Sequence, residues 1–243
     1  ILHEQEYVTI ASYESTTLQI LRKLLELSQN GIKGQKELNA KFIRDNKSIF
    51  DNVDVSKQKA IKYAFVNSKL LLIYGAAGTG KTTLINYISS LMPKSKKLFL
   101  TKTHNAIQHL RRRIENPGNN SDFISFDSFT KKVELPDYDI IFVDECSIID
   151  NFTMLKFVNK ISENSLIVLA GDINQIESID FGNWFYYAKH IITTHGANIE
   201  LLDTWRTKEE SLLSLWEEVR NNHRKACHRW TLFKRNRIRY IYF

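Results

Sequence analysis

Residues 75–82 read GAAGTGKT, from Gly75 to Thr82, and follow directly on the apolar run LLLIY at residues 70–74. The stretch matches G-x-x-x-x-G-K-[ST] at every fixed position, and it lies between an expected strand and an expected helix at residues 83–91. Glycines here let successive backbone N–H groups point at one anion, which the helix N-terminus also attracts. The sequence therefore predicts a phosphate-binding loop, against the alternative of a chance glycine-rich turn.

The polar residues of this loop predict a site for a nucleoside triphosphate and its metal ion. Lys81 is expected to reach the β- and γ-phosphates during catalysis, and the Thr82 hydroxyl is expected to bind Mg²⁺. The other residues expected to contact the nucleotide are Gly75, Gly78, Thr79, Gly80 and Thr83. ATP and Mg²⁺ are thus the predicted cofactors.

The second half of the predicted site follows the apolar run YDIIFV at residues 138–143. This run reads as a buried strand that ends in Asp144 and Glu145. A carboxylate at this position can hold Mg²⁺, directly or through water, and its neighbour can orient or deprotonate the attacking water. Cys146 comes next and is interpreted as a small buried residue, because no motif pairs it with a base.

The spacing of the apolar runs predicts an α/β fold with a doubly wound, mostly parallel sheet. Helices are expected at 17–27, 35–50, 56–66 (capped by Ser56) and 106–114, and residues 124–129 alternate like a half-buried strand. Five strands are expected at residues 70–74, 97–101, 138–143, 165–170 and 198–203. Ligands of such folds bind at the carboxyl ends of the strands, where the polar motifs fall.

Three regions are predicted along the chain. Residues 1–50 form an N-terminal helical accessory segment, residues 51–207 the ATPase domain, and residues 208–243 the start of a missing second domain with an aberrant or truncated basic tail. No apolar run approaches the roughly 18 residues of a membrane span, and no signal peptide is visible. The two cysteines form neither a disulfide framework nor a metal site, so a cytoplasmic location is expected.

The positive charge of the chain is concentrated in two places. The formal net charge is +7, but eight of the 34 Lys and Arg residues lie after residue 219, and the rest of the chain has 26 basic and 27 acidic residues. In the final segment, basic and aromatic residues interleave, which fits either a nucleic-acid-binding arm or a frame-shifted end. A second basic run, between residues 94 and 113, is either a solvated surface or a contact surface for a phosphate backbone.

The ordered motifs resemble those of superfamily 1 helicases, in particular the RecD-like and Dda-like enzymes of the B-type branch. The resemblance spans residues 55–207 and rests on Gln58, GAAGTGKT, TKTHNA (101–106), ISFDSF (124–129), VDECS (143–147), GDINQIESIDFGNWF (171–185) and TWR (204–206). It implies that the sheet is the RecA-like first motor domain of a DNA helicase. A strand-separating hairpin usual in the branch has no room between residues 130 and 137.

Carried over to this sequence, the resemblance assigns roles beyond the phosphate-binding loop. It implies adenine contact by Gln58, whose amide matches the paired donor and acceptor of the adenine edge. It implies γ-phosphate sensing by Gln175 and an arginine finger at Arg206, both counted as catalytic together with Lys81 and Glu145. The residues that match DNA-contacting stretches are Thr103, His104, Ser125 and Phe126.

The function expected is that of an ATP-hydrolysing motor domain, truncated before the second RecA-like domain. Two alternatives are a stand-alone, nucleotide-dependent DNA-binding or loader-type ATPase and another P-loop enzyme such as a kinase. The expected partner is single-stranded DNA, with RNA left open and other replication or repair proteins as further candidates. No membrane association is expected, and the oligomeric state is left open.

Overall fold

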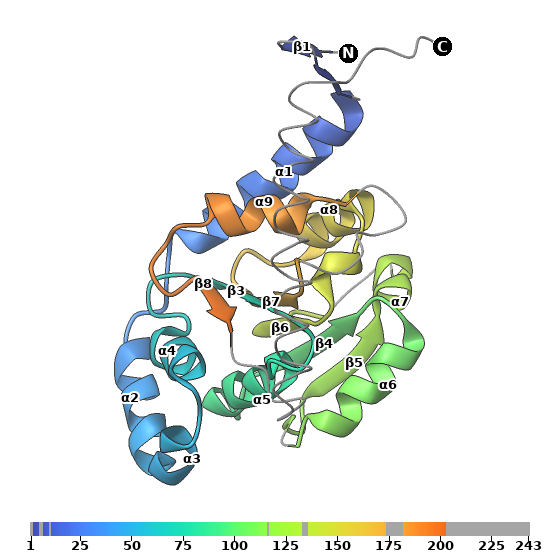
Figure 1. Cartoon of the computed structure of the whole chain (residues 1–243). Coiled ribbons are helices and arrows are strands. Elements are labelled where there is room, and N and C mark those ends of the chain that lie inside the picture. The colour runs from blue at the N-terminus through green and yellow to red at the C-terminus, as the bar shows by residue number, and fades with distance from the viewer. Residues whose placement is uncertain are drawn as a thin grey trace, which may run out of the picture.

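The computed structural model describes residues 2–4, 7–9, 11–115, 117–132, 136–173 and 182–202. Its centre is a sheet in the order β5-β4-β6-β7-β3-β8, in which every neighbouring pair is parallel (Figure 1). The strands are β3 (Leu70–Gly75), β4 (Lys97–Thr101), β5 (Ser121–Ser125), β6 (Ile140–Val143), β7 (Leu166–Gly171) and β8 (Asn198–Leu201). The predicted fold class is confirmed, with β5 as an additional strand.

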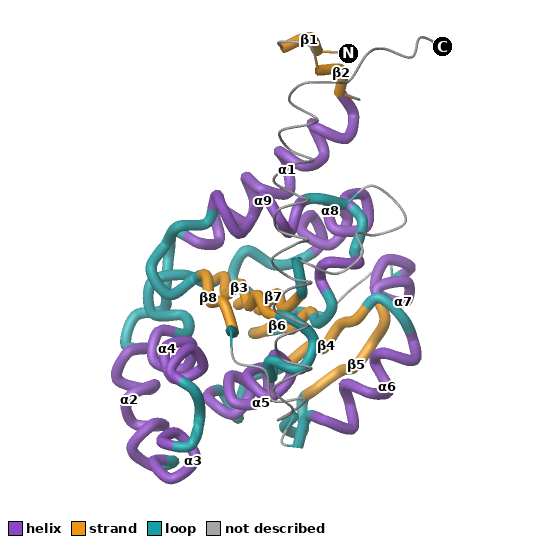
Figure 2. Tube along the Cα trace, in the orientation of Figure 1, coloured by secondary structure: helices purple, strands orange, loops and turns teal. Residues whose placement is uncertain are grey.

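Helices cover both faces of this sheet (Figure 2). One face carries α4 (Val55–Tyr63), α5 (Lys81–Leu91) and α6 (His104–Arg113), and the other carries α1 (Ala11–Ser28), α8 (Asn151–Lys160) and α9 (Trp184–Ile191). The alternating residues of β3 divide between two buried clusters, Leu70, Leu72 and Tyr74 in one and Leu71 and Ile73 in the other. A parallel sheet buried on both faces explains why its strands read as continuous apolar runs.

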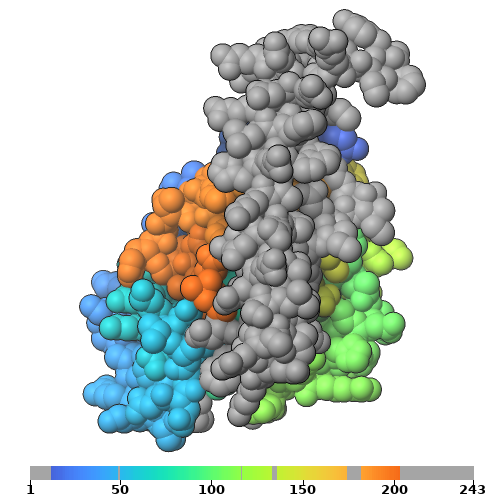
Figure 3. All heavy atoms as spheres, in the orientation of Figure 1, coloured from blue at the N-terminus to red at the C-terminus, as the bar shows by residue number. Residues whose placement is uncertain are grey.

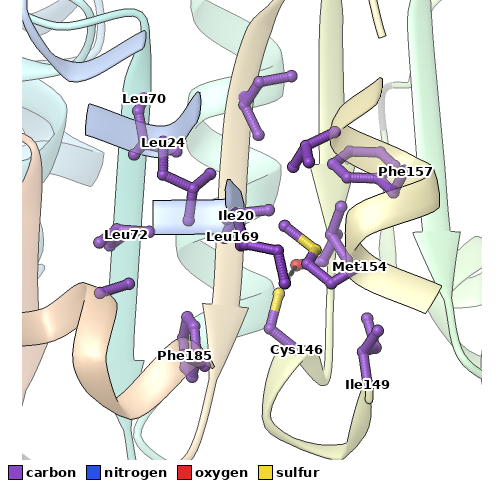
Figure 4. Packing of buried hydrophobic residues seen from close by; sticks show 14 of the residues in the cluster. Ile20, Leu24, Leu70, Leu72, Cys146, Ile149, Met154, Phe157, Leu169 and Phe185 are labelled. Atoms are coloured by element: carbon purple, nitrogen blue, oxygen red, sulfur yellow. Dashed lines mark hydrogen bonds between the residues drawn. The ribbon is translucent and has the colours of Figure 1, made fainter. Parts of the chain in front are cut away.

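The N-terminal helix α1 forms part of the core rather than a separate layer. Its Ile20 and Leu24 are fully buried and belong to the same cluster as Leu70 and Leu72 of β3 (Figure 4). The buried amide of Asn151, at the start of α8, donates to the Thr17 hydroxyl at 2.6 Å. The predicted domain boundaries at residues 50 and 207 remain predictions.

The second predicted helix is divided into α2 (Gln35–Asp45) and α3 (Lys47–Asp51). At the break, the side-chain amide of Asn46 donates to the Phe42 carbonyl oxygen at 2.9 Å. Asn39 of α2 is buried and donates to the carbonyl oxygens of Lys62 and Ala64, which joins α2 to the end of α4.

In the space-filling view, α2 to α4 lie on one side of the molecule and α6 lies on the other (Figure 3). Among the described residues, no helix has the length and apolar character that a membrane span requires.

Of residues 124–129, whose alternation resembles a half-buried strand, only the first two belong to a strand. The chain ends β5 at Ser125 and continues as α7 (Phe126–Lys131), because the Ser125 hydroxyl accepts from the Ser128 N–H and caps the helix. Phe126 and Phe129 are three residues apart, so they share the buried face of this helix. A short antiparallel pair, β1 (Leu2–Glu4) and β2 (Tyr7–Thr9), was not expected, and α4 is capped by Asp54 rather than Ser56.

Lys97 belongs to the basic run of the sequence but does not contribute to its surface. Its side chain is fully buried at the start of β4, and its Nζ donates to the carbonyl oxygen and the hydroxyl of Ser89 at 2.8 and 3.0 Å. Burial lowers the pKa of the Lys97 ammonium. The unfolded chain therefore holds this proton more tightly than the folded one.

We expect Lys97→Met to reduce the dependence of stability on alkaline pH. Between the lowered pKa of the folded protein and about 10.4 in the unfolded chain, the unfolded state binds more protons, so the free energy of unfolding rises with pH. Lys97→Met removes this contribution, and urea unfolding at several pH values between 7 and 10.5 measures it. Lys94→Met, at an exposed position, is the control. Equal pH slopes for wild type and Lys97→Met would contradict this account.

Candidate nucleotide-binding site

The loop between β3 and α5 has the backbone that an anion site needs. Gly78 and Gly80 have φ values of 86° and 85°, in the left-handed region that favours glycine. A Cβ on Gly80 would also lie 2.8 Å from Cε of Lys57, so the position excludes a side chain on two grounds. Helix α5 begins at the next residue, and its first turn presents backbone N–H groups to the space above the loop.

Lys81 lies between the loop and a group of carboxylates. Its Nζ donates to the carbonyl oxygens of Gly75 at 2.7 Å and Ala76 at 3.0 Å. Burial lowers the pKa of Lys81, and the negative charges of Asp172, Asp144 and Glu145 oppose that effect. The ammonium is therefore held close to the position where β- and γ-phosphates would meet the helix N-terminus.

The two side chains predicted to bind Mg²⁺ are in contact. The Thr82 hydroxyl donates to Oδ2 of Asp144 at 3.2 Å, although the two residues are 62 positions apart in the sequence. Burial raises the pKa of Asp144, and the Glu145 N–H, which donates to Oδ1 at 2.9 Å, and the Lys81 charge oppose this rise. A hydroxyl and a carboxylate supply the hard oxygen atoms that Mg²⁺ prefers, so these residues fit the ion.

Glu145 has an unusual backbone conformation. Its φ and ψ are 59° and 39°, in the left-handed region, which is uncommon for a residue other than glycine. Burial, and secondarily the Asp144 charge, raises the pKa of its carboxyl group, while Lys81, Arg113 and His109 oppose the rise. A carboxylate with a raised pKa is better matched to accepting a proton from water near neutral pH.

The remaining loop residues support its shape. Thr79 is buried and its hydroxyl donates to the Ala76 carbonyl oxygen at 2.9 Å. A Cβ on Gly75 would collide with that hydroxyl, so Gly75 allows the close approach. Thr83 is exposed in the first turn of α5. Contacts of these residues to a nucleotide stay predictions.

Gln58 lies in the first turns of α4, and its side-chain NH₂ is used within the protein. It donates to the carbonyl oxygens of Phe50 at 3.1 Å and Val53 at 3.0 Å. The amide thereby fixes the connection between α3 and α4. Adenine recognition by Gln58 stays a prediction.

The four residues predicted to contact nucleic acid lie in two different environments. Thr103 and His104 are exposed just after β4, where the Thr103 hydroxyl caps α6 by accepting from the Ala106 N–H at 3.2 Å. Ser125 and Phe126 are buried, and the Phe126 ring packs 5.6 Å from that of Phe157. The Phe126 ring is thus part of the core and anchors α7, and the contacts of these four residues with nucleic acid stay predictions. The predicted Gln175 and Arg206 lie outside the described residues.

Two further residues of the site were missed by the sequence analysis. Asp172 directly follows β7, is 6% exposed, and its charge acts on Lys81. Its position after a strand that neighbours β3 could have indicated it. Lys57 is 3% exposed, pairs with Asp54 and approaches Gly80. Nothing in the sequence indicated Lys57, because a lysine in an amphipathic helix usually faces solvent.

This chain is similar to a known protein family and to several characterised proteins. The family described as AAA domain (AAA_30) matches residues 54–241. The RecBCD enzyme subunit RecD of Buchnera aphidicola subsp. Acyrthosiphon pisum is 28% identical over 56% of this chain and 27% of its own length. The DNA polymerase alpha-associated DNA helicase A of Schizosaccharomyces pombe is 31% identical over 35% of this chain and 13% of its own length. The chain thus spans about a quarter or less of these curated relatives.

Solved helicase structures are also similar to this chain. The structure of Bacteroides Pif1 bound to single-stranded DNA is 16% identical, with a TM-score of 0.46, over 70% of this chain and 46% of that chain. The family match is the stronger finding, because it covers α4, the phosphate-binding loop and both carboxylates. The chain belongs to the AAA domain family, whose model matches more than half of its length.

Proposed function

We propose that this chain binds Mg-ATP at the loop between β3 and α5 and hydrolyses it as the motor of an ATP-dependent DNA helicase. The observation that carries the proposal is the convergence of Lys81, Thr82, Asp144 and Glu145. The first two follow β3 and the last two follow β6, yet the Thr82 hydroxyl reaches Asp144 and the charges of Asp144 and Glu145 act on Lys81. All four lie at the carboxyl ends of parallel strands, where ligands of this fold bind.

Each of these residues has a distinct task in the proposed reaction. Mg²⁺, held by Thr82 and Asp144, would neutralise charge on the phosphate oxygens. Lys81 leaves the carbonyl oxygens of Gly75 and Ala76 for the β- and γ-phosphates, and the N–H groups around Gly80 orient the chain of phosphates. Glu145 accepts a proton from the attacking water. We also propose that Gln175 senses the γ-phosphate and that Arg206 acts as the arginine finger.

Single-stranded DNA is the proposed partner, and RNA is the alternative. Measuring the affinity for a DNA strand and an RNA strand of the same length distinguishes them. The exposed Thr103 and His104 support the proposed partner, since they lie at the carboxyl end of β4, which β6 and β7 separate from β3, on the same edge of the sheet. Replication or repair proteins are proposed as further partners, because RecD is a subunit of the RecBCD enzyme. A cytoplasmic location is part of the same proposal.

Glu145→Gln tests this assignment. The amide keeps the size of the side chain but cannot accept the proton, so we expect the rate of phosphate release to fall by a factor of about 10² to 10⁴ while Mg-ATP still binds. Phosphate release with and without an oligo-dT strand, and the affinity for a fluorescent ATP analogue, are the measurements. In the wild type, the acid limb of the rate should lie above the ordinary Glu pKa of about 4.3, because burial raises the pKa of Glu145.

Glu37→Gln, on the exposed surface of α2, is the matched control and should retain the wild-type rate. An unchanged rate in Glu145→Gln would show that another residue activates the water. Transfer of the γ-phosphate to an added small-molecule acceptor rather than to water would instead identify a kinase and overturn the helicase assignment.

A further inference from the structure

The first turn of α8 carries an aromatic side chain with no place in the core. Phe152 is 64% exposed, more than any other Phe, Tyr or Trp whose side chain the structure describes. An isolated exposed apolar residue would need no explanation. This ring, however, has a cation above it, because the Nζ of Lys156 lies 4.2 Å from its centroid. A cation over an aromatic face is attracted by the ring quadrupole.

The helix turn that carries this ring is linked to the loop proposed to contact nucleic acid. Asp150 caps α8 by accepting from the Thr153 N–H at 2.8 Å, and its other oxygen pairs with Lys102 at 3.3 Å. Lys102 immediately precedes the exposed Thr103 and His104 at the carboxyl end of β4. The start of α8 is thus joined to the loop proposed to contact single-stranded DNA.

Lysines continue from Phe152 along the outer surface of α8. Lys156 and Lys160 follow at intervals of four residues, so the three side chains share one face of the helix. The Nζ of Lys160 donates to the neutral carbonyl oxygens of Thr130 and Lys132, at 2.8 and 2.9 Å, beside the end of α7. The charged exposed side chains on α7 and directly after it are Asp127, Lys131 and Lys132. The surface is therefore mainly basic, with one aromatic platform at its end.

We propose that Phe152 stacks on a base of single-stranded DNA, and that Lys156 and Lys160 contact the phosphates of the same strand. The inference rests on the proposed function, which supplies the strand at Thr103 and His104. Proteins that bind single strands without sequence preference combine basic surfaces with aromatic platforms, because every base has a π-face. A base on the Phe152 ring displaces Lys156, whose ammonium then reaches a phosphate. A protein partner is the competing occupant, and the basic charge beside the ring favours the polyanion.

Fluorescence anisotropy with a labelled oligo-dT strand tests this proposal on the full chain. We expect Phe152→Ala to weaken binding by roughly tenfold or more, the loss of one stacked base, and Phe152→Trp to retain it. Lys156→Gln should weaken binding less and lower the slope of log K against log salt by about 0.7, the value for one phosphate on a single strand. Tyr186→Ala removes an exposed aromatic side chain from α9 and is the matched control.

The outcomes separate this inference from the function on which it rests. If the wild type binds oligo-dT and Mg-ATP but Phe152→Ala and Lys156→Gln bind DNA as tightly as Tyr186→Ala, the proposal for α8 is wrong and the motor assignment stands. If the wild type binds Mg-ATP and no single strand, both the DNA partner and this contact are wrong. Loss of DNA affinity in Phe152→Ala with unchanged ATP affinity supports both the single-stranded DNA partner and the contact at α8.

Discussion

Lys81→Ala is expected to reduce ATP turnover by a factor of about 10² to 10³, comparable to the loss of one preorganised donor from an active site. The ammonium lies against the carbonyl oxygens of Gly75 and Ala76 and within the field of Asp144, Glu145 and Asp172. Without it, the transferring phosphoryl group faces these carboxylates with no cation from the loop. The affinity for ATP should therefore fall together with the rate, unlike in Glu145→Gln.

Phosphate release and binding of a fluorescent ATP analogue, each with and without oligo-dT, measure the two effects. Lys59→Ala, at an exposed position of α4, is the control for removing a lysine near the site. The result against this account would be normal ATP affinity and turnover in Lys81→Ala, since the loop would then not be the nucleotide site. Thermal unfolding should be little changed, because Lys81 donates only to carbonyl oxygens at the edge of the loop.

Asp54→Ala is expected to lower the free energy of unfolding by about 3 kcal/mol. This value is the lower end of the range for removing one partner of a buried ion pair. Asp54 accepts from the Lys57 N–H at 2.9 Å and pairs with the Lys57 ammonium, and both side chains are at least nine-tenths buried. The substitution removes the helix cap and leaves the buried ammonium without this carboxylate. Because Lys57 approaches Gly80, the ATP affinity should fall as well.

Urea unfolding of Asp54→Ala, Lys57→Ala and the double variant measures the coupling of the pair. Asp51→Ala, in the exposed part of α3, is the control. Burial tends to raise the pKa of Asp54, but hydrogen bonds and the charge of Lys57 outweigh it, so the net pKa is lowered. The stabilisation is thus present above the unfolded pKa of about 3.9 and is lost as the pH falls through the folded value. A loss in Asp54→Ala no larger than in Asp51→Ala would contradict this interpretation.

Much of the fold could be predicted because a doubly buried parallel sheet leaves an unambiguous pattern. Strand β4 has the predicted bounds, and the other four predicted strands differ by one or two residues at their ends. The phosphate-binding loop and the meeting of Thr82 with Asp144 followed from the rule that polar residues after parallel strands share an edge. The roles of these residues toward ATP stay predictions.

The features that were missed depend on which side of an element faces the core. The alternation at residues 124–129 fits a strand, but the Ser125 cap turns the same residues into a helix whose Phe126 is buried. Lys97 and Lys57 read as surface charges and are buried, because each finds a local oxygen partner. Whether α1 packed on the sheet could not be decided, since its partners are far away in the sequence.

The position of α1 has a consequence for the order in which the protein folds during synthesis. The helices on the opposite face, α4 to α6, lie between residues 55 and 113, and their cluster also needs β6, β7 and β8, as far as Leu201. The hydrogen bond of Thr17 to Asn151 spans 134 positions, and α9 begins only at Trp184. Ile20 and Leu24 thus leave the ribosome before Leu70 and Leu72 of β3, and long before α8 and α9. Until α8 and α9 emerge, the apolar face of α1 stays partly uncovered, and chaperones can bind it.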